Sequence, residues 1–514
     1  MAGEMNAADR SHPLYDDNIG KWDLYRNAAK GGGDFINESN LFTHRLEDAE
    51  DYTQRLDRAY YLNFCDSIPN MYNSYIFRNN IERPVDTNLE LFRKNCDGKG
   101  TSISDFVKLA GYYGSVYGVM HIFVDMPESK KKNPSVADVK NEGILPYCSL
   151  LHPTQLKDFS VDEFGNFRWV IIEYKYYKDL DPAIERVEET HYKVITTEKW
   201  WIEDQDGNKV TFEEKERKSE GVNKLKFIPI ITLYNKDNGE DNKIGESLLK
   251  DIVRINRIIM NWCSCIDEQV ERQTFSQLIM PDDADMDEDE ERGADPLDRV
   301  GTSSIFTFNP DSRHPPAFIS PNTDNINTIW SLVEDHIKEI FRLSGLQGGT
   351  ADLYTSKSGK QSQTEFKGVN AALVEKAMTY QKCENSISKL AYVLLGQDDT
   401  NYEDVKYPKT FDVVELGEEI DNLFRILERN FSSTLNKTIM KDVARKSIPL
   451  APESIRTTAE SEIDSGDGVV TSLNQSKTPV PVKDGEGNPN TNLSQSFITN
   501  KQMKDTKSQH RTQE

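Results

Sequence analysis

Three long stretches of the sequence repeat apolar residues at intervals of three and four, and this spacing predicts three long helices. The first two stripes consist of Leu248, Ile252, Ile255, Ile259, Trp262, Ile266 and Val270, and of Ile326, Trp330, Val333, Ile337 and Ile340. The third runs from Phe366 to Leu394, and its roughly 30 residues would span about 45 Å as one helix. A narrow stripe on such long helices suits packing against other helices, within the chain or between copies of it.

The region from Val116 to about Tyr234 has a different pattern, with β-branched and aromatic residues alternating in runs such as "FRWVIIEYKYY" and "HYKVITTEKWWIED". Period-two runs of this kind predict strands. The stretches "DEFGN" and "DQDGN" predict tight turns between them, so Asp204 and Asp206 are better explained as turn formers than as metal ligands. The sequence as a whole therefore predicts an α+β fold.

Two further helical regions precede the strands. "RLDRAYYLNFCDSIPNMYNSYIFRNNIERP" has the spacing of a core-facing helix, and "TNLELFRKNCDGKGTSISDFVKLAGYYG" predicts a second helix that is interrupted at "DGKG". The first 40 or so residues are polar and contain "KGGGDF", and the last 50 or so are poor in large apolar side chains, so we expect both ends to be unstructured.

The length of 514 residues predicts about three domains. The formal net charge of −24 argues against binding of nucleic acid over a broad surface, although a local basic contact or a duplex inside a repelling channel remains open. No apolar run approaches the roughly 20 residues of a membrane span, and the N-terminus does not resemble a secretory signal. The six cysteines are scattered, so we expect reduced, buried thiols.

The search for catalytic or ligand motifs is mostly negative. The acidic run from Asp282 to Glu291 fails as a calcium loop, because Glu288 and Ala294 stand where Gly and Glu are needed. "TSKSGKQSQ" fails as a phosphate loop at Tyr354 and Gln361. We expect no enzyme activity, no cofactor and no metal, although a site assembled from distant residues remains open.

The order of the segments resembles that of the portal proteins of tailed bacteriophages. The resemblance is carried by "ISDFVKLAGYYGSVYGVMHIFVDMP", then "LPYCSLLHPTQLKDFSVDEFGNFRWVIIEYKYY", then "KFIPIITLYNKDNGEDNKIGESLLKDIVRINRIIMNWCSCIDEQVERQTFSQLIMP". It covers most of the chain from about Leu56 to Ile455, and it rests on segment order and loose patterns.

The resemblance implies a ring, usually a dodecamer, at one vertex of a viral capsid. Double-stranded DNA would be packed and ejected through its channel. The implied partners are the terminase large subunit, head-completion or adaptor proteins, and the major capsid and scaffolding proteins, with no membrane. Such a protein would be assembled in the host cytoplasm and would reside at the portal vertex of the virion.

The resemblance also implies a division of the chain into parts. These are an N-terminal arm at 1–45, an α/β wing at 46–242, stem helices at 243–275 and 323–346 with an inserted clip at 276–322, a tunnel loop at 347–364, a long helix and wing return at 365–415, a helical crown at 416–463, and a C-terminal tail at 464–514.

Two sets of site residues follow from this division. In the tunnel loop, Lys357 and Lys360 would touch DNA phosphates, which requires charge but no reading of bases. The loop's small polar residues Ser356, Ser358 and Gln361 would share this contact, although a plain interhelical loop with solvated lysines explains the same residues. The stem helices would pack through Ile255, Trp262, Trp330 and Ile337.

Two other classes of protein stay open. A packaging enzyme such as a terminase or nuclease should show a phosphate loop or a carboxylate cluster for metal, and the sequence shows neither. A structural head-tail adaptor or capsid protein without DNA contact would share the helical stripes and would not need the lysines.

Overall fold

The chain has an α+β fold, and the structure is a computed structural model. It describes residues 5–45, 47–127, 144–178, 182–183, 185–212, 218–236, 243–274, 277–279, 317–319, 324–346, 359–411, 423–429, 432–447 and 453–465. The chain divides into two compact units, Met1–Asp412 and Val413–Glu514, and each is described by itself. Within the described residues, no helix is long and apolar enough to span a lipid bilayer.

The N-terminal residues are ordered, so the expectation of an unstructured arm over 1–45 is wrong for residues 5–45. A short 3-10 helix, η1 (Ala7–Asp9), precedes helix α1 (Pro13–Lys30), which begins at a proline and is capped by His12. Helix α1 buries Trp22 and Tyr25 in the main core. Few apolar residues are needed here, because each aromatic ring buries a large area.

The next helices surround the start of the β-rich region. They are α2 (Ala49–Arg58), α3 (Phe64–Arg78), α4 (Glu90–Lys94) and α5 (Ile103–Tyr117). The single helix expected over "RLDRAYYLNFC…" is wrong, because Asn63 caps α3 by accepting a hydrogen bond from the Asp66 amide and so starts a new helix. The expected interruption at "DGKG" is confirmed between α4 and α5, where Gly98 and Gly100 have positive φ.

The β-rich region forms two antiparallel sheets, as the alternating pattern predicts. The smaller has the order β2–β1–β8 and the larger the order β3–β4–β5–β6–β7. Their strands are β1 (Val119–Asp125), β2 (Tyr147–Leu151), β3 (Leu156–Val161), β4 (Phe167–Lys178), β5 (Val187–Thr196), β6 (Lys199–Glu203), β7 (Glu220–Val222) and β8 (Ile230–Tyr234).

Side chains of the large sheet alternate between two separate apolar clusters. Val170 and Ile172 of β4 join a cluster that includes Leu151 of the small sheet, whereas Ile171 faces the opposite side. On that opposite side, Ala7 of η1 packs against the sheet. The N-terminal segment therefore covers a face of the large sheet that would otherwise be open to water.

Two glycines, Gly118 between α5 and β1 and Gly245 between β8 and α7, lie in close contact. Gly118 has φ +94°, and a Cβ on it would lie 2.5 Å from the carbonyl oxygen of Gly245. A Cβ on Gly245 would in turn collide with the carbonyl of Gly118. Ser247 fixes this crossing, because its hydroxyl donates to the Val116 carbonyl over 2.6 Å.

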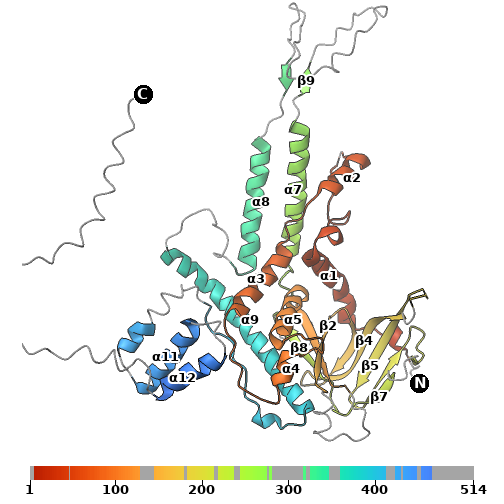
Figure 1. The fold of residues 1–514 in the computed structure, drawn as a ribbon. Helices are drawn as coiled ribbons and strands as arrows, with labels where there is room; N and C mark the ends of the chain where they lie inside the picture. Colours follow the sequence, from red (N-terminus) through yellow and green to blue (C-terminus); the bar gives the residue numbers. More distant parts are fainter. Residues whose placement is uncertain are drawn as a thin grey trace, which may run out of the picture. The chain divides into compact units, whose positions relative to one another are not determined.

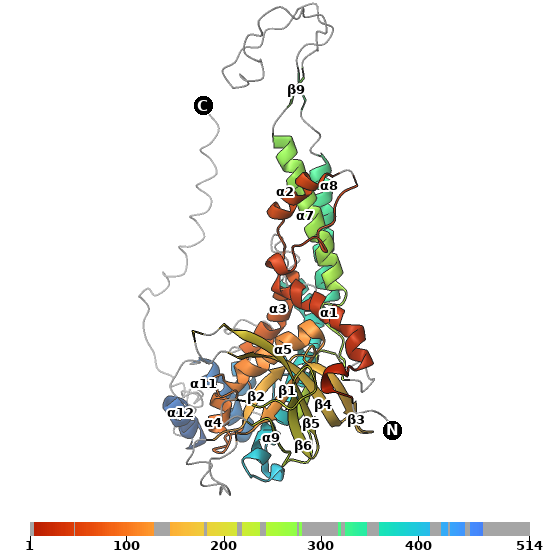
Figure 2. The same ribbon diagram turned by 90° about the vertical axis from the view of Figure 1, so that its right-hand side faces the viewer.

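Helices α7 (Ile252–Thr274) and α8 (Asp324–Leu343) lie side by side as an antiparallel pair (Figures 1 and 2). Between them, β9 (Gln277–Ile279) pairs antiparallel with β10 (Ala317–Ile319). The acidic run from Asp282 to Glu291 lies outside the described residues. The long helix α9 (Gly359–Leu394) packs against α3, α5 and β8.

The start of the long helix differs from the expected boundary. We expected a loop through residue 364, whereas α9 already begins at Gly359. Residues 360–366 contain lysine, glutamines and a glutamate, which are good helix formers and can extend the helix in the N-terminal direction. The second unit contains α11 (Ser433–Ser447) and α12 (Glu453–Ser465), which pack against each other. Five of the six cysteines are buried and all are free, as expected, whereas Cys265 is half-buried.

Candidate functional site

The α7–α8 pair contains the four residues that the sequence analysis assigned to packing of the stem. Its helices would be about 35 and 30 Å long at 1.5 Å per residue. Ile259 and Cys263 of α7 and Val333 and Ile340 of α8 are buried in the main core. The apolar stripes read from the sequence therefore do hold the two helices to the body of the first unit.

Of the four residues expected to pack the stem helices, three contact the main core of the first unit. Ile255, Trp262 and Ile337 are partly buried against the main core. The Trp262 ring meets the His336 ring edge-on at a centroid distance of 4.7 Å. Trp330 does not join this seam, because 43% of it is exposed and its indole donates to Glu334 of the same helix.

Further large apolar side chains on the two helices are exposed. Ile258 and Val270 of α7 and Leu332 and Leu343 of α8 are each more than a third exposed. Exposed apolar residues scattered singly over a surface are ordinary, so these four side chains do not by themselves define an interface.

The segment that joins α8 to α9 leaves the body at a well-anchored point. Gly345 has φ +73° and ends α8, and Leu346 is buried. The Tyr72 hydroxyl donates to the Ser344 carbonyl over 2.6 Å. The following stretch therefore starts from a fixed position above α3.

The expected DNA-contacting residues lie mostly beyond what the structure describes. Ser356, Lys357 and Ser358 lie outside the described residues. The backbones of Lys360 and Gln361 belong to the first turn of α9, and their side chains are not among those described. The structure thus places two of the five positions on a helix rather than in a loop, and it does not test the phosphate contact.

Helix α9 carries two buried charged groups. The Glu384 carboxylate, fully buried, accepts hydrogen bonds from Arg83 at 2.6 and 3.0 Å and from the Tyr407 hydroxyl at 2.6 Å. Lys376 is 7% exposed, and its ammonium donates to the Asn235 side-chain oxygen over 2.6 Å. Burial lowers the pKa of Lys376 to about 7.

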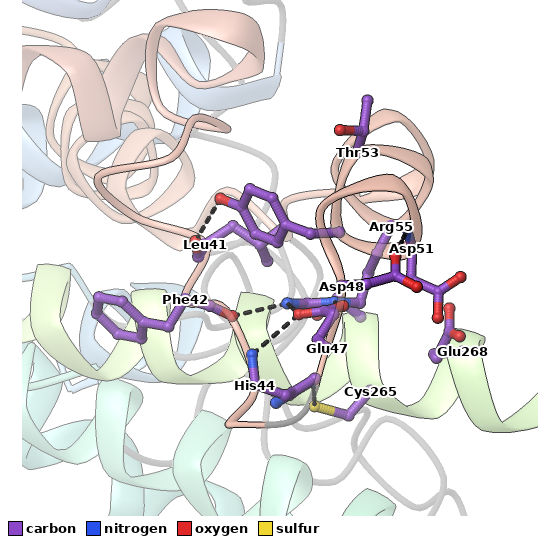
Figure 3. Close-up of polar contacts among 12 residues, drawn as sticks. Leu41, Phe42, His44, Glu47, Asp48, Asp51, Thr53, Arg55, Cys265 and Glu268 are labelled. Atoms are coloured by element: carbon purple, nitrogen blue, oxygen red, sulfur yellow. Dashed lines mark hydrogen bonds and ion pairs between the residues drawn. The ribbon is translucent and has the colours of Figure 1, made fainter.

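A second polar cluster, which the sequence did not signal, joins residues 42–58 to α7 (Figure 3). Its centre is Arg55, which is 1% exposed and donates to both carboxylate oxygens of Glu47, at 2.6 and 2.7 Å. Arg55 also donates to the Phe42 carbonyl and to the Ser264 hydroxyl. The hydrogen bonds from Arg55 hold the pKa of Glu47 at about 2.

This cluster was missed because helix spacing brings side chains into direct contact only three or four residues apart, whereas Glu47 and Arg55 stand eight residues apart. A buried arginine also has no signature in a single sequence. The local signal is Asp48, which caps α2 by accepting a hydrogen bond from the Asp51 amide and so sets the start of the helix that carries Arg55.

Among the described residues, no group of three or more histidine, cysteine, aspartate or glutamate side chains is arranged to hold a metal ion. A scan against protein-family models finds no match, and no curated protein matches the sequence. The fold and its surfaces are therefore the basis for a functional proposal.

Proposed function

We propose that this chain is a portal protein. Copies of it would form a ring at a capsid vertex, double-stranded DNA would be packed and ejected through the central channel, and the ring would dock the terminase and the neck proteins. The observation that carries the proposal is the order of elements after the sheets. A helix pair, α7 and α8, brackets an insert that begins and ends in paired strands, and the long helix α9 follows directly.

The exposed apolar side chains on α7 and α8 support assembly into a ring. Trp330 and Leu332 lie on α8, and Ile258 lies on α7, so both helices present apolar area to a neighbour. A cyclic ring uses two different surfaces of each subunit, and a helix pair of this kind has two sides to offer.

The charge of the chain supports passage of DNA rather than tight binding. With a net charge of −24, most of the surface would repel a duplex within about 8 to 10 Å at ordinary salt. A channel that must let DNA slide requires this low adhesion, and a few lysines suffice for transient phosphate contacts.

Electron microscopy of the purified full-length chain tests the proposal. We expect rings with an axial opening wide enough for a B-form duplex. A monomer, a filament or a closed disc would contradict it. Rings that assemble but prove dispensable for DNA uptake by capsids in a reconstituted packaging reaction would instead support the structural adaptor.

A further inference from the structure

Residues 42–58, here called the strap, contact helix α7 and the main core of the first unit. The strap includes α2, whose only buried residue is Arg55. Phe42 is 50% exposed, and the described residues from Thr43 to His44 are also exposed. Tyr52 and Leu56 of the strap are partly buried against the main core. The strap is therefore held by this small apolar contact together with polar contacts to α7.

Both ends of the strap are fixed by apolar burial. Leu41, immediately before it, is fully buried in the main core. After it, Asn63 donates to the Ala29 carbonyl over 2.8 Å, and Cys65 and Ile68 of α3 are fully buried. The strap therefore lies between two buried segments, Leu41 and α3, which stay in place when the strap leaves α7.

The strap lies on α7 through specific hydrogen bonds and ion pairs. The Phe42 amide donates to the Asn261 side-chain oxygen over 2.8 Å, and Arg55 donates to the Ser264 hydroxyl over 2.9 Å. Arg58 pairs with Glu268 over 2.6 Å and also with Glu271. Figure 3 shows the strap crossing α7 at this level.

The strap also covers part of Cys265. The His44 ring lies 3.5 Å from the Cys265 sulfur, and burial raises the pKa of this thiol. Cys263, two residues earlier on the same helix, is fully buried in the main core. One thiol of α7 therefore reports on the strap and the other on the core.

We propose that the strap is a latch on α7. It opens as a unit between its anchors while the body of the first unit stays folded, and Arg55 holds it closed by shaping it around Glu47 and joining it to Ser264. Polar contacts of this kind exchange for water at little net cost, and Tyr52 and Leu56 are only partly buried, so the strap opens more easily than the core. A role in regulation rests on the proposed function. If α7 is the first stem helix, its outer side becomes free when the strap leaves, and the latch then regulates the stem.

Thiol labelling of the full-length chain tests the latch without any ligand. N-ethylmaleimide is added to the wild type and to the Arg55→Lys and Glu47→Gln variants, and the labelling rates of Cys265 and Cys263 are followed by peptide mass spectrometry. Lysine keeps the charge but loses the forked geometry, and glutamine keeps the shape but loses the charge. Arg45→Lys, at an exposed position of the same strap, is the matched control.

We expect Cys265 to label at least about fivefold faster in both variants, because each weakens or loses hydrogen bonds between Arg55 and its partners. Cys263 should stay unlabelled, and Arg45→Lys should behave as the wild type. In wild-type protein, low urea should speed labelling of Cys265 before that of Cys263, which tests the latch even if a variant fails to fold.

Unchanged Cys265 rates in both variants would overturn the latch, and so would equal rates for the two cysteines at every urea concentration. These outcomes do not depend on ring assembly, which electron microscopy of the same samples reports separately. A chain that forms no rings but labels as expected would therefore disprove the portal proposal and leave the latch standing.

Discussion

At the scale of single residues, buried and partly buried cationic side chains have two kinds of partner. Arg55 and Arg83 each meet a carboxylate in a two-pronged pair, with Glu47 and Glu384. Lys376 instead donates to the neutral amide of Asn235, and its ammonium lies 4.9 Å from the centre of the Tyr72 ring. Arginine suits buried carboxylates because its fork matches their geometry, whereas a buried lysine tends to lose its proton.

Replacing Lys376 with methionine should stabilise the protein at pH 6. Burial lowers the pKa of Lys376 from 10.5 to about 7, so the unfolded state binds the proton more tightly. Stability of the wild type should therefore rise with pH between about 7 and 10.5. At pH 6, Lys376→Met removes a charge penalty on the order of 4 kcal/mol and loses one hydrogen bond worth about 1 to 2 kcal/mol.

Urea unfolding at pH 6 and pH 9 measures this effect. Lys376→Met should gain about 1 to 3 kcal/mol at pH 6 and less at pH 9. Lys382→Met, at an exposed position of the same helix, should change little at either pH. A variant that is equally destabilised at both pH values would show that Lys376 stabilises the fold through its contacts.

At the scale of elements, the sequence predicted what depends on repeated apolar spacing. The stripes of α7, α8 and α9 and the alternation in β4 and β5 require only a period, and a single sequence displays a period directly. The order in residues 5–45 was missed, because it depends on Trp22 and on hydrogen bonds to distant segments. The strap was missed for the same reason, since Arg55 is buried only through partners brought together by the fold.

A substitution at Trp330 tests packing between chains separately from packing within the chain. Because it is largely exposed, Trp330→Asp should change the monomer's free energy of unfolding by only about 0.5 kcal/mol, yet it should shift the assembly from rings to monomers. Light scattering and urea unfolding measure the two effects. Ser331→Asp adds the same charge on a different side of α8 and should retain rings. Normal rings from Trp330→Asp would exclude this side of α8 from the interface.

Ile337 should behave differently from Trp330. It is partly buried against the main core, so Ile337→Asp places a carboxylate in apolar surroundings and should cost about 2 kcal/mol or more of stability. The equivalent change Ile255→Asp on α7 should act alike, and both should lose rings together with stability. Thermal unfolding that is unchanged in both variants would show that the stripes do not hold the helix pair.

At the scale of the whole first unit, the N-terminal segment ties together parts that are far apart in the sequence. Arg10 pairs with Asp158 of β3 over 2.9 Å, α1 packs against α3 and α5, and the strap reaches Ser264 of α7. One continuous stretch therefore connects the large sheet with the helix pair. Any motion of the helix pair against the sheet has to be accommodated by this stretch.

The proposed function makes its sharpest demand on the segment between α8 and α9. If residues 347–364, which include the first residues of α9, line the channel, the double change Lys357→Glu and Lys360→Glu adds repulsion in every subunit of the ring. Rings should keep a normal melting temperature but should fill capsids slowly or incompletely in a purified packaging reaction. Lys382→Glu, farther along α9, is the control and should pack normally.

Packaging by the double variant at the wild-type rate and to the wild-type length would show that these lysines play no part in DNA handling. Rings that fall apart would instead assign the segment a structural role within the assembly.

The crossing of Gly118 and Gly245 limits which substitutions the chain can tolerate over evolutionary time. Each glycine lies where the other's backbone carbonyl leaves no room for a Cβ, so enlarging one cannot be compensated by shrinking the other. In a library of all single substitutions, we expect both positions to accept glycine alone, whereas Gly20, with open space around it in α1, should accept alanine. The junction between sheet and helix pair should therefore stay fixed in sequence while the surfaces on either side of it diverge.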